Sequence, residues 1–230
     1  MLLVAAGLPV VAAAVLAVEV QLARTGPRLP DVAHDFDGGS PDAPLAVWLG
    51  DSTAAGVGAD EAEETVPLRV AAATGERVRV LAVSGATVAE VVEDQLPLLE
   101  GLDPARIYVS VGSNDVTHLT GASDFRQSYE ELVRRLPDVP LILLGVPDMG
   151  SPPRLAQPLR AIAGLRGRQL DKEIRRIAAA DKRATYVDIA GHTGPPFRRD
   201  PDRYFSADKY HPSGEGYRLW SEAVVRDSGG

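Results

Sequence analysis

Five short apolar runs, separated by longer segments with helical periodicity, constrain the fold of this chain more than any other feature. The runs cover residues 45–49, 77–83, 106–111, 140–146 and 185–189. Apolar runs of this length are typical of strands buried on both faces of a sheet, and the segments between them repeat apolar residues three or four positions apart. The alternation predicts an α/β domain with a five-stranded parallel sheet and helices on both faces.

An apolar segment over residues 1–24 precedes this pattern, and it carries no charged side chain before Glu19. It is just long enough for a membrane-spanning helix, which needs about 20 residues. Three alternatives remain open: a membrane anchor, a cleaved signal peptide, or a hydrophobic helix packed on the domain. We expect a membrane-associated or secreted protein, with membrane association through residues 1–23 and the side of the membrane undetermined.

Residues 25–44 hold four prolines and three glycines and have no apolar period. Such a composition is typical of a linker. We therefore expect the folded domain to occupy residues 45–230, beginning near Leu45.

The charge balance and the absence of cysteine exclude several classes of function. The chain has 24 basic and 32 acidic residues, a formal net charge of −8, which argues against a nucleic-acid-binding protein. Without cysteine there is no disulfide, thiol nucleophile, iron–sulfur cluster or thiolate zinc site. The glycines at 56 and 58 lack the third glycine of a dinucleotide-binding loop.

Polar residues follow the expected strands where a parallel sheet binds its ligands, beyond the carboxyl ends. They form four blocks, at residues 50–53, 84–87, 112–115 and 208–212. In the first block, Ser52 follows a strand and a Gly-Asp turn, so its hydroxyl should lie at this edge. A serine hydroxyl needs a base to become nucleophilic, and His211 is the candidate base.

Asp208 precedes His211 by three residues, so its carboxylate can fold back onto the imidazole within one turn. That contact would leave the other ring nitrogen facing Ser52. Asp188, at the end of the fifth run, is an alternative carboxylate, and Ser52 could instead cap a turn. We expect Asp51 to brace the turn and Ser213, rather than Asp208, to cap the last helix.

Three donors could bind a negative oxygen next to Ser52: the backbone N–H groups of Ser52 and Gly85 and the side-chain amide of Asn114. One such donor is typically worth about 3 kcal/mol to a transition state that carries an oxyanion. We expect Asp115 to hold Asn114 in place through backbone hydrogen bonds.

Together, the four blocks resemble the SGNH (GDSL) hydrolase superfamily, in the same order and over about residues 45–225. The resemblance implies a flavodoxin-like three-layer α/β/α sandwich and a serine-dependent esterase, lipase, deacetylase or acyltransferase without a metal or cofactor. It assigns Ser52 as nucleophile, Asp208 and His211 as its partners, and Ser52, Gly85 and Asn114 as the oxyanion hole. One departure is that no asparagine shortly precedes Gly85.

We therefore expect hydrolysis of carboxylic esters through an acyl-enzyme, on a small-molecule, lipid or glycolipid ester. The alternatives are an acyltransferase or deacetylase acting on a sugar or lipid hydroxyl, and a non-catalytic binding module on the same fold. The segments 147–158 and 190–207 are expected to be loops that wall the cleft. Their apolar side chains lie next to arginines, which could seat an acyl chain beside a polar head.

Overall fold

The computed structural model describes residues 27 and 29–229 and contains a six-stranded sheet with the order β1-β3-β2-β4-β5-β6. The five predicted strands are confirmed and are parallel to one another. They are β2 (Leu45–Gly50), β3 (Arg77–Val80), β4 (Arg106–Ser110), β5 (Leu141–Leu144) and β6 (Ala184–Val187). In this flavodoxin-like order, β2 and β4 are neighbours whose connections leave in opposite directions, which is where open α/β sheets bind ligands.

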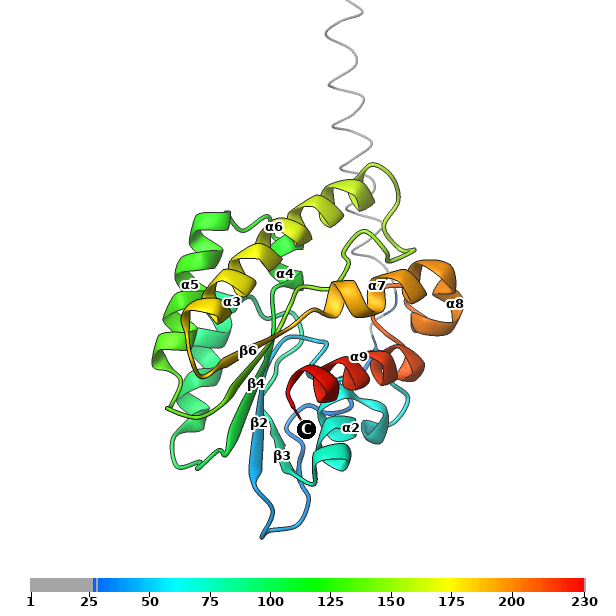
Figure 1. The fold of residues 1–230 in the computed structure, drawn as a ribbon. Coiled ribbons are helices and arrows are strands. Elements are labelled where there is room, and N and C mark those ends of the chain that lie inside the picture. The colour runs from blue at the N-terminus through cyan, green and yellow to red at the C-terminus, as the bar shows by residue number, and fades with distance from the viewer. Residues whose placement is uncertain (1–26, 28, 230) are drawn as a thin grey trace, which may run out of the picture.

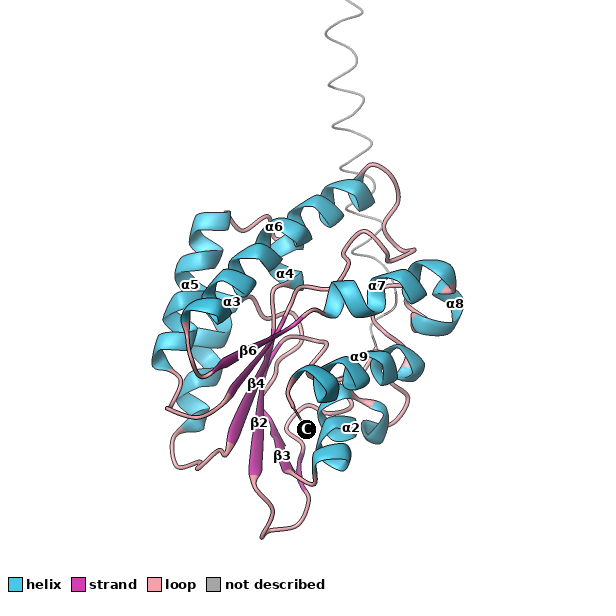
Figure 2. Cartoon of the chain, in the orientation of Figure 1, coloured by secondary structure: helices cyan, strands magenta, loops and turns pink. Residues whose placement is uncertain are grey.

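Helices cover both faces of the sheet (Figures 1 and 2). One layer contains α3 (Val88–Glu90), α4 (Ser113–Thr117), α5 (Ala122–Arg135) and α6 (Leu159–Ala180), and the other contains α2 (Val66–Thr74), α7 (Ile189–Arg199), α8 (Pro201–Tyr204) and α9 (Gly214–Asp227). Alternate residues of β2 enter the two cores. Val47 and Leu49 pack in the core below α5 and α6, whereas Trp48 packs in the core below α2 and α9.

The sheet has one strand more than the sequence predicted. The short β1 (Asp37–Gly38) pairs antiparallel with β3 at the edge of the sheet, with Asp37 opposite Arg79. Two polar residues at an edge carry no apolar alternation, so no pattern in the sequence could have indicated this strand.

The segment expected as a linker, 25–44, packs on the domain over much of its described part. Ala33 is fully buried, and its N–H donates to the carbonyl of Ala55 at 2.9 Å. The guanidinium of Arg79 donates to the Asp35 carbonyl at 2.6 Å. The segment therefore docks through backbone groups and a few apolar side chains, Val32, Ala33 and Phe36, which stand among prolines, glycines and charged residues in the sequence.

The hydrophobic helix expected over residues 1–24 lies outside the described residues. Among residues 27 and 29–229, no helix is both long enough and apolar enough to cross a membrane.

The expected loop over 190–207 is mostly helical, which corrects the prediction. It contains α7 and α8. Proline disfavours helix interiors, and α7 contains Pro195 and Pro196. However, Ile189, Thr193 and Phe197 recur every four residues and are all buried, so packing of this face holds the segment in a helix.

Candidate active site

Ser52 lies in a tight turn directly after β2, the central strand. The turn begins at Gly50, whose φ is +146° and where a Cβ atom would lie 1.9 Å from the carbonyl oxygen of Ser110. Only glycine allows the two backbones to approach so closely. Asp51 then braces the turn as predicted, because its Oδ1 accepts hydrogen bonds from the N–H and the hydroxyl of Thr53 at 2.9 and 2.8 Å.

His211 lies between α8 and α9, in a segment fixed at several points. Its carbonyl accepts from the Ser206 N–H at 2.9 Å, and Phe205 pairs with Pro212 in an isolated bridge. The hydroxyl of Tyr217, one turn into α9, donates to the Val57 carbonyl at 2.6 Å. This last bond ties the helix after His211 to the turn after Ser52.

Ser52, His211 and Asp208 are brought into line by these connections. The His211 Nε2 atom lies 3.0 Å from Ser52 Oγ, and Nδ1 lies 2.6 Å from Asp208 Oδ2. With Nδ1 donating to the carboxylate, Nε2 is left as the acceptor for the Ser52 hydroxyl. The arrangement can therefore pass the serine proton to the imidazole.

Asp208 is held as a carboxylate. Burial alone would raise its pKa, but hydrogen bonds and the charge of His211 hold the pKa well below its usual range. Its Oδ1 accepts from the Ser206 hydroxyl and from the N–H groups of Tyr210 and His211 at 2.8–2.9 Å. An ionised Asp208 fixes the ring orientation and stabilises a protonated His211.

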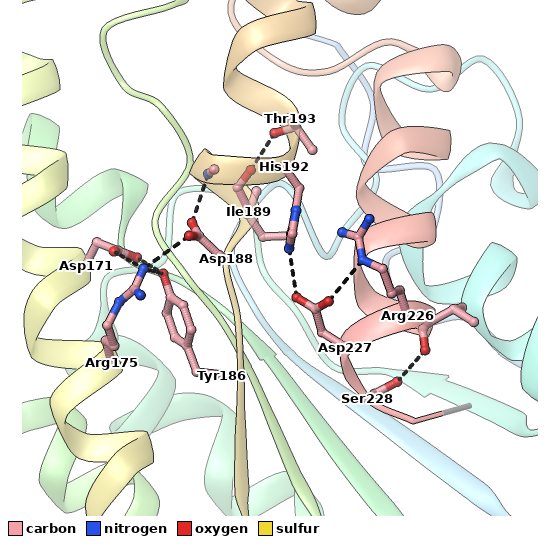
Figure 3. A network of polar contacts seen from close by, with 12 residues as sticks. Asp171, Arg175, Tyr186, Asp188, Ile189, His192, Thr193, Arg226, Asp227 and Ser228 are labelled. Carbon is pink, nitrogen blue, oxygen red and sulfur yellow. Dashed lines mark hydrogen bonds and ion pairs between the residues drawn. The ribbon is translucent and has the colours of Figure 1, made fainter.

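Asp188, the alternative carboxylate, has a different role. Its Oδ1 accepts from the Gly191 N–H at 2.8 Å and caps α7, while its Oδ2 accepts from the Arg175 guanidinium at 3.2 Å. Figure 3 shows Arg175 between Asp188 and the Tyr186–Asp171 pair, and His192 directed instead to Asp227.

Ser213 caps α9, as expected, by accepting from the Gly216 N–H.

Asn114, the second residue of α4, lines the same cavity as Ser52 and His211. Its Nδ2 donates one proton to the Ala86 carbonyl at 3.0 Å, which orients the amide and leaves one N–H for a ligand. Asp115 acts on the neighbouring segment, because its Oδ2 accepts from the Val88 N–H at 3.1 Å.

The backbone N–H groups of Ser52 and Gly85 have no hydrogen-bond partner within the described part of the chain. Both are therefore available as donors. Gly85 has a φ of +89° and is exposed, but it is not among the residues that line the cavity beside Ser52. Its place in an oxyanion hole stays a prediction.

A small apolar cavity opens beside Ser52. It offers about 40 Å³ to water-sized molecules, which is room for about three of them. Apart from Ser52, Asn114 and His211, its walls include Met149, Phe197, Phe205 and Trp220. Met149, Phe197 and Phe205 come from the two segments that were expected to wall the cleft.

Two residues of this region were missed from the sequence. Trp220 is 2% exposed and belongs to the core, yet its side chain also borders the cavity. The Arg154 guanidinium lies 3.9 Å from Asp208 Oδ2. Helical spacing in the sequence cannot distinguish a core residue from one that also borders a small cavity. Arg154 lies in the 147–158 segment, where no sequence motif indicates that it is close to Asp208.

Comparisons with known proteins identify the family to which the chain is similar. The family model described as "GDSL-like Lipase/Acylhydrolase family" matches residues 48–219. A GDSL-like esterase of Mycobacterium tuberculosis is 37% identical over an alignment of 187 positions, and the match covers 76% of this chain. The chain spans 59% of the length of that curated relative.

Solved structures show the same fold. A phospholipase A1 from Streptomyces albidoflavus superposes with a TM-score of 0.64 at 20% identity, covering 80% of this chain and 99% of that one. A lipase/acylhydrolase from Enterococcus faecalis superposes with a TM-score of 0.58 at 26% identity, covering 80% of this chain and 94% of that one.

Proposed function

This chain belongs to the GDSL-like lipase/acylhydrolase (SGNH) family of carboxylic ester hydrolases, and on that premise we propose that it hydrolyses carboxylic esters through a Ser52–His211–Asp208 triad. The observation that carries the proposal is the 3.0 Å separation between Ser52 Oγ and His211 Nε2. A catalytic base must lie within hydrogen-bond reach of the proton it takes.

The reaction then proceeds in two halves. Ser52 Oγ attacks the ester carbonyl while its proton passes to His211 Nε2, which returns the proton to the departing alcohol. A water molecule gives a proton to the same nitrogen and attacks the acyl-enzyme, and the acid leaves with Ser52 regenerated. Asp208 stays ionised throughout and stabilises the imidazolium in both halves.

The negative oxygen formed in each half needs donors that are already oriented. The Asn114 amide and the Ser52 and Gly85 N–H groups are proposed for this role. The Ala86 carbonyl supports the assignment of Asn114 because it fixes the amide before substrate arrives.

The cavity beside Ser52 favours a short acyl group. The space is small, about 40 Å³, so we expect acetyl to butyryl groups to be accepted more readily than longer chains. The apolar walls give such a group no hydrogen-bonding partner, which suits an alkyl chain.

Hydrolysis of p-nitrophenyl acetate and butyrate by the full chain and by Ser52→Ala tests the proposal. The variant should lose at least about 1,000-fold in kcat, since the remaining groups cannot supply a nucleophile of equal reactivity. Equal activity in both proteins would exclude Ser52 as the nucleophile.

A further inference from the structure

Exposed apolar side chains gather at the catalytic edge of the domain. In the described part of the chain, the large hydrophobic residues that are exposed are Val83, Leu98, Leu119, Ile162 and Leu165. Val83 follows β3, and its N–H donates to the Gly50 carbonyl. Leu119 follows α4, and Ile162 and Leu165 lie in the first turns of α6. Only Leu98 precedes the amino end of a strand. Figure 1 shows α4 and the start of α6 beyond the carboxyl ends of the strands.

Three of these residues form what we call the rim patch: Leu119, Ile162 and Leu165, which are 66%, 36% and 62% exposed. Ile162 and Leu165 lie three positions apart and so share one face of α6. Leu119 lies beside this face, because Arg166 of α6 donates to the carbonyls of Val116 and Thr120 on either side of it.

The backbone at Leu119 is strained. Its φ is +61°, a left-handed conformation that is unfavourable for a residue with a Cβ atom and that glycine adopts freely. The turn nevertheless presents a leucine, with two-thirds of its surface exposed, directly after a helix that carries Asn114. Such strain at an exposed position points to a contact outside the domain.

Arginines lie close in sequence to two residues of the rim patch. Residues 149–170, between Asp148 and Asp171, contain four arginines and no acidic residue, and one of the four, Arg154, lies beside Asp208. Arg160 and Arg166 donate to backbone carbonyls, which do not neutralise a guanidinium charge. Arg168 is exposed and forms no ion pair with any residue that the structure describes.

From these observations we infer that the rim patch docks on a lipid bilayer with anionic headgroups. Exposed leucines and isoleucines beside arginines are the combination by which a protein face enters the headgroup region. Docking would direct the Ser52 cavity toward the membrane, and it goes beyond the proposed hydrolysis without requiring it.

The absence of cysteine allows a direct test in the full chain. L165C is labelled with a polarity-sensitive fluorophore, and L98C, at a leucine that is 52% exposed, serves as the matched control. With phosphatidylcholine vesicles containing phosphatidylglycerol, the label at 165 should shift to the blue and be quenched by brominated lipid, while the label at 98 stays unchanged.

Three outcomes would overturn the inference. Labels at 165 and 98 that respond alike would mean that the protein is held only by another segment. If the label at 165 is already shielded without vesicles and the shielding does not depend on protein concentration, residues 1–23 cover the patch. If the shielding increases with protein concentration, a second copy of the chain covers it. The fluorescence of the label does not depend on ester hydrolysis. A protein that fails to dock can therefore be distinguished from a protein that fails to hydrolyse esters.

The charge contribution is tested by R168Q in the labelled L165C protein, with R134Q as control because Arg134 is 70% exposed at the far end of α5. Removing one arginine near an anionic surface should weaken docking about fivefold, and added salt should weaken it further. R134Q should leave docking unchanged. Equal docking of R168Q and R134Q would contradict an anionic-lipid site.

Discussion

The Nε2 atom of His211 lies 3.0 Å from the Oγ atom of Ser52, although 159 positions separate the two residues in the chain. The contact depends on two ends of the fold. β2 carries Ser52 to the carboxyl edge, and α9 is tied to the turn after it by the Tyr217–Val57 hydrogen bond. The pair is thus fixed by the packing of α9 as well as by local turns.

Asp208→Asn is expected to lower kcat by about 10,000-fold, because an asparagine can hold His211 in the wrong tautomer and cannot stabilise the imidazolium. The measurement is steady-state hydrolysis of p-nitrophenyl acetate. Asp188→Asn is the matched control, and it should retain wild-type kcat because that carboxylate only caps α7 and pairs with Arg175. Loss of activity in D188N with D208N active would assign the triad carboxylate to Asp188.

Asn114→Ala should lower kcat about 100-fold and leave KM nearly unchanged, since its free N–H would bind the oxyanion more strongly than the ground-state carbonyl. Thr117→Ala, which removes only a hydroxyl that donates to the Asn114 carbonyl, should leave kcat unchanged. A rise in KM alone in N114A would place the amide in substrate binding.

Activity should fall between butyryl and hexanoyl esters, because the space beside Ser52 is small, about 40 Å³. Met149→Ala, which removes part of its wall, should raise the ratio of hexanoate to acetate hydrolysis. Leu155 provides the control: it is 3% exposed in the same 147–158 segment but does not line the cavity. If L155A changed the ratio as much as M149A, the preference for short acyl groups would depend on the general packing of this segment and not on the size of the cavity.

Asp51 should make the protein less stable as pH rises. Burial raises the pKa of Asp51 from 3.8 to about 6, against the hydrogen bonds from Thr53. Its Oδ2 is buried without a hydrogen-bond partner. The folded state therefore binds the Asp51 carboxyl proton more tightly than the unfolded state, so the free energy of unfolding falls by about 2 kcal/mol between pH 4 and pH 6.

Urea unfolding of the wild type and Asp51→Asn across this range measures the effect. The variant should lack the Asp51 part of the decline and be the more stable protein above pH 6. Asp208 acts with the opposite sign and at lower pH, because its depressed pKa stabilises the fold above about pH 4. Parallel pH curves for the two proteins would contradict the raised pKa of Asp51.

The five parallel strands could be predicted from the sequence, and so could the position of Ser52, Asp208 and His211 at one edge of the sheet. Both predictions depend only on the order of the segments along the chain and on the length of the apolar runs. The sequence missed β1 and the docking of Ala33, where backbone hydrogen bonds replace a hydrophobic pattern. It also predicted a loop where α7 forms, because the cost of Pro195 and Pro196 is local and the compensating burial of Phe197 is tertiary.

The exposure of Ile162 illustrates the same limit. Ile162 belongs to the same helix as Leu170, Ile174 and Ile177, but its side chain lies outside the core that those three enter. Sequence periodicity locates a helix but cannot tell a residue that packs inward from one that meets a partner.

Labelling of the full chain with a fluorophosphonate tests the central claim most directly. The account predicts a single adduct on Ser52, located by mass spectrometry of the digested protein, and loss of that adduct in His211→Ala, whose serine is no longer activated. An adduct on another residue, or a wild-type protein that is folded and remains unlabelled, would contradict it.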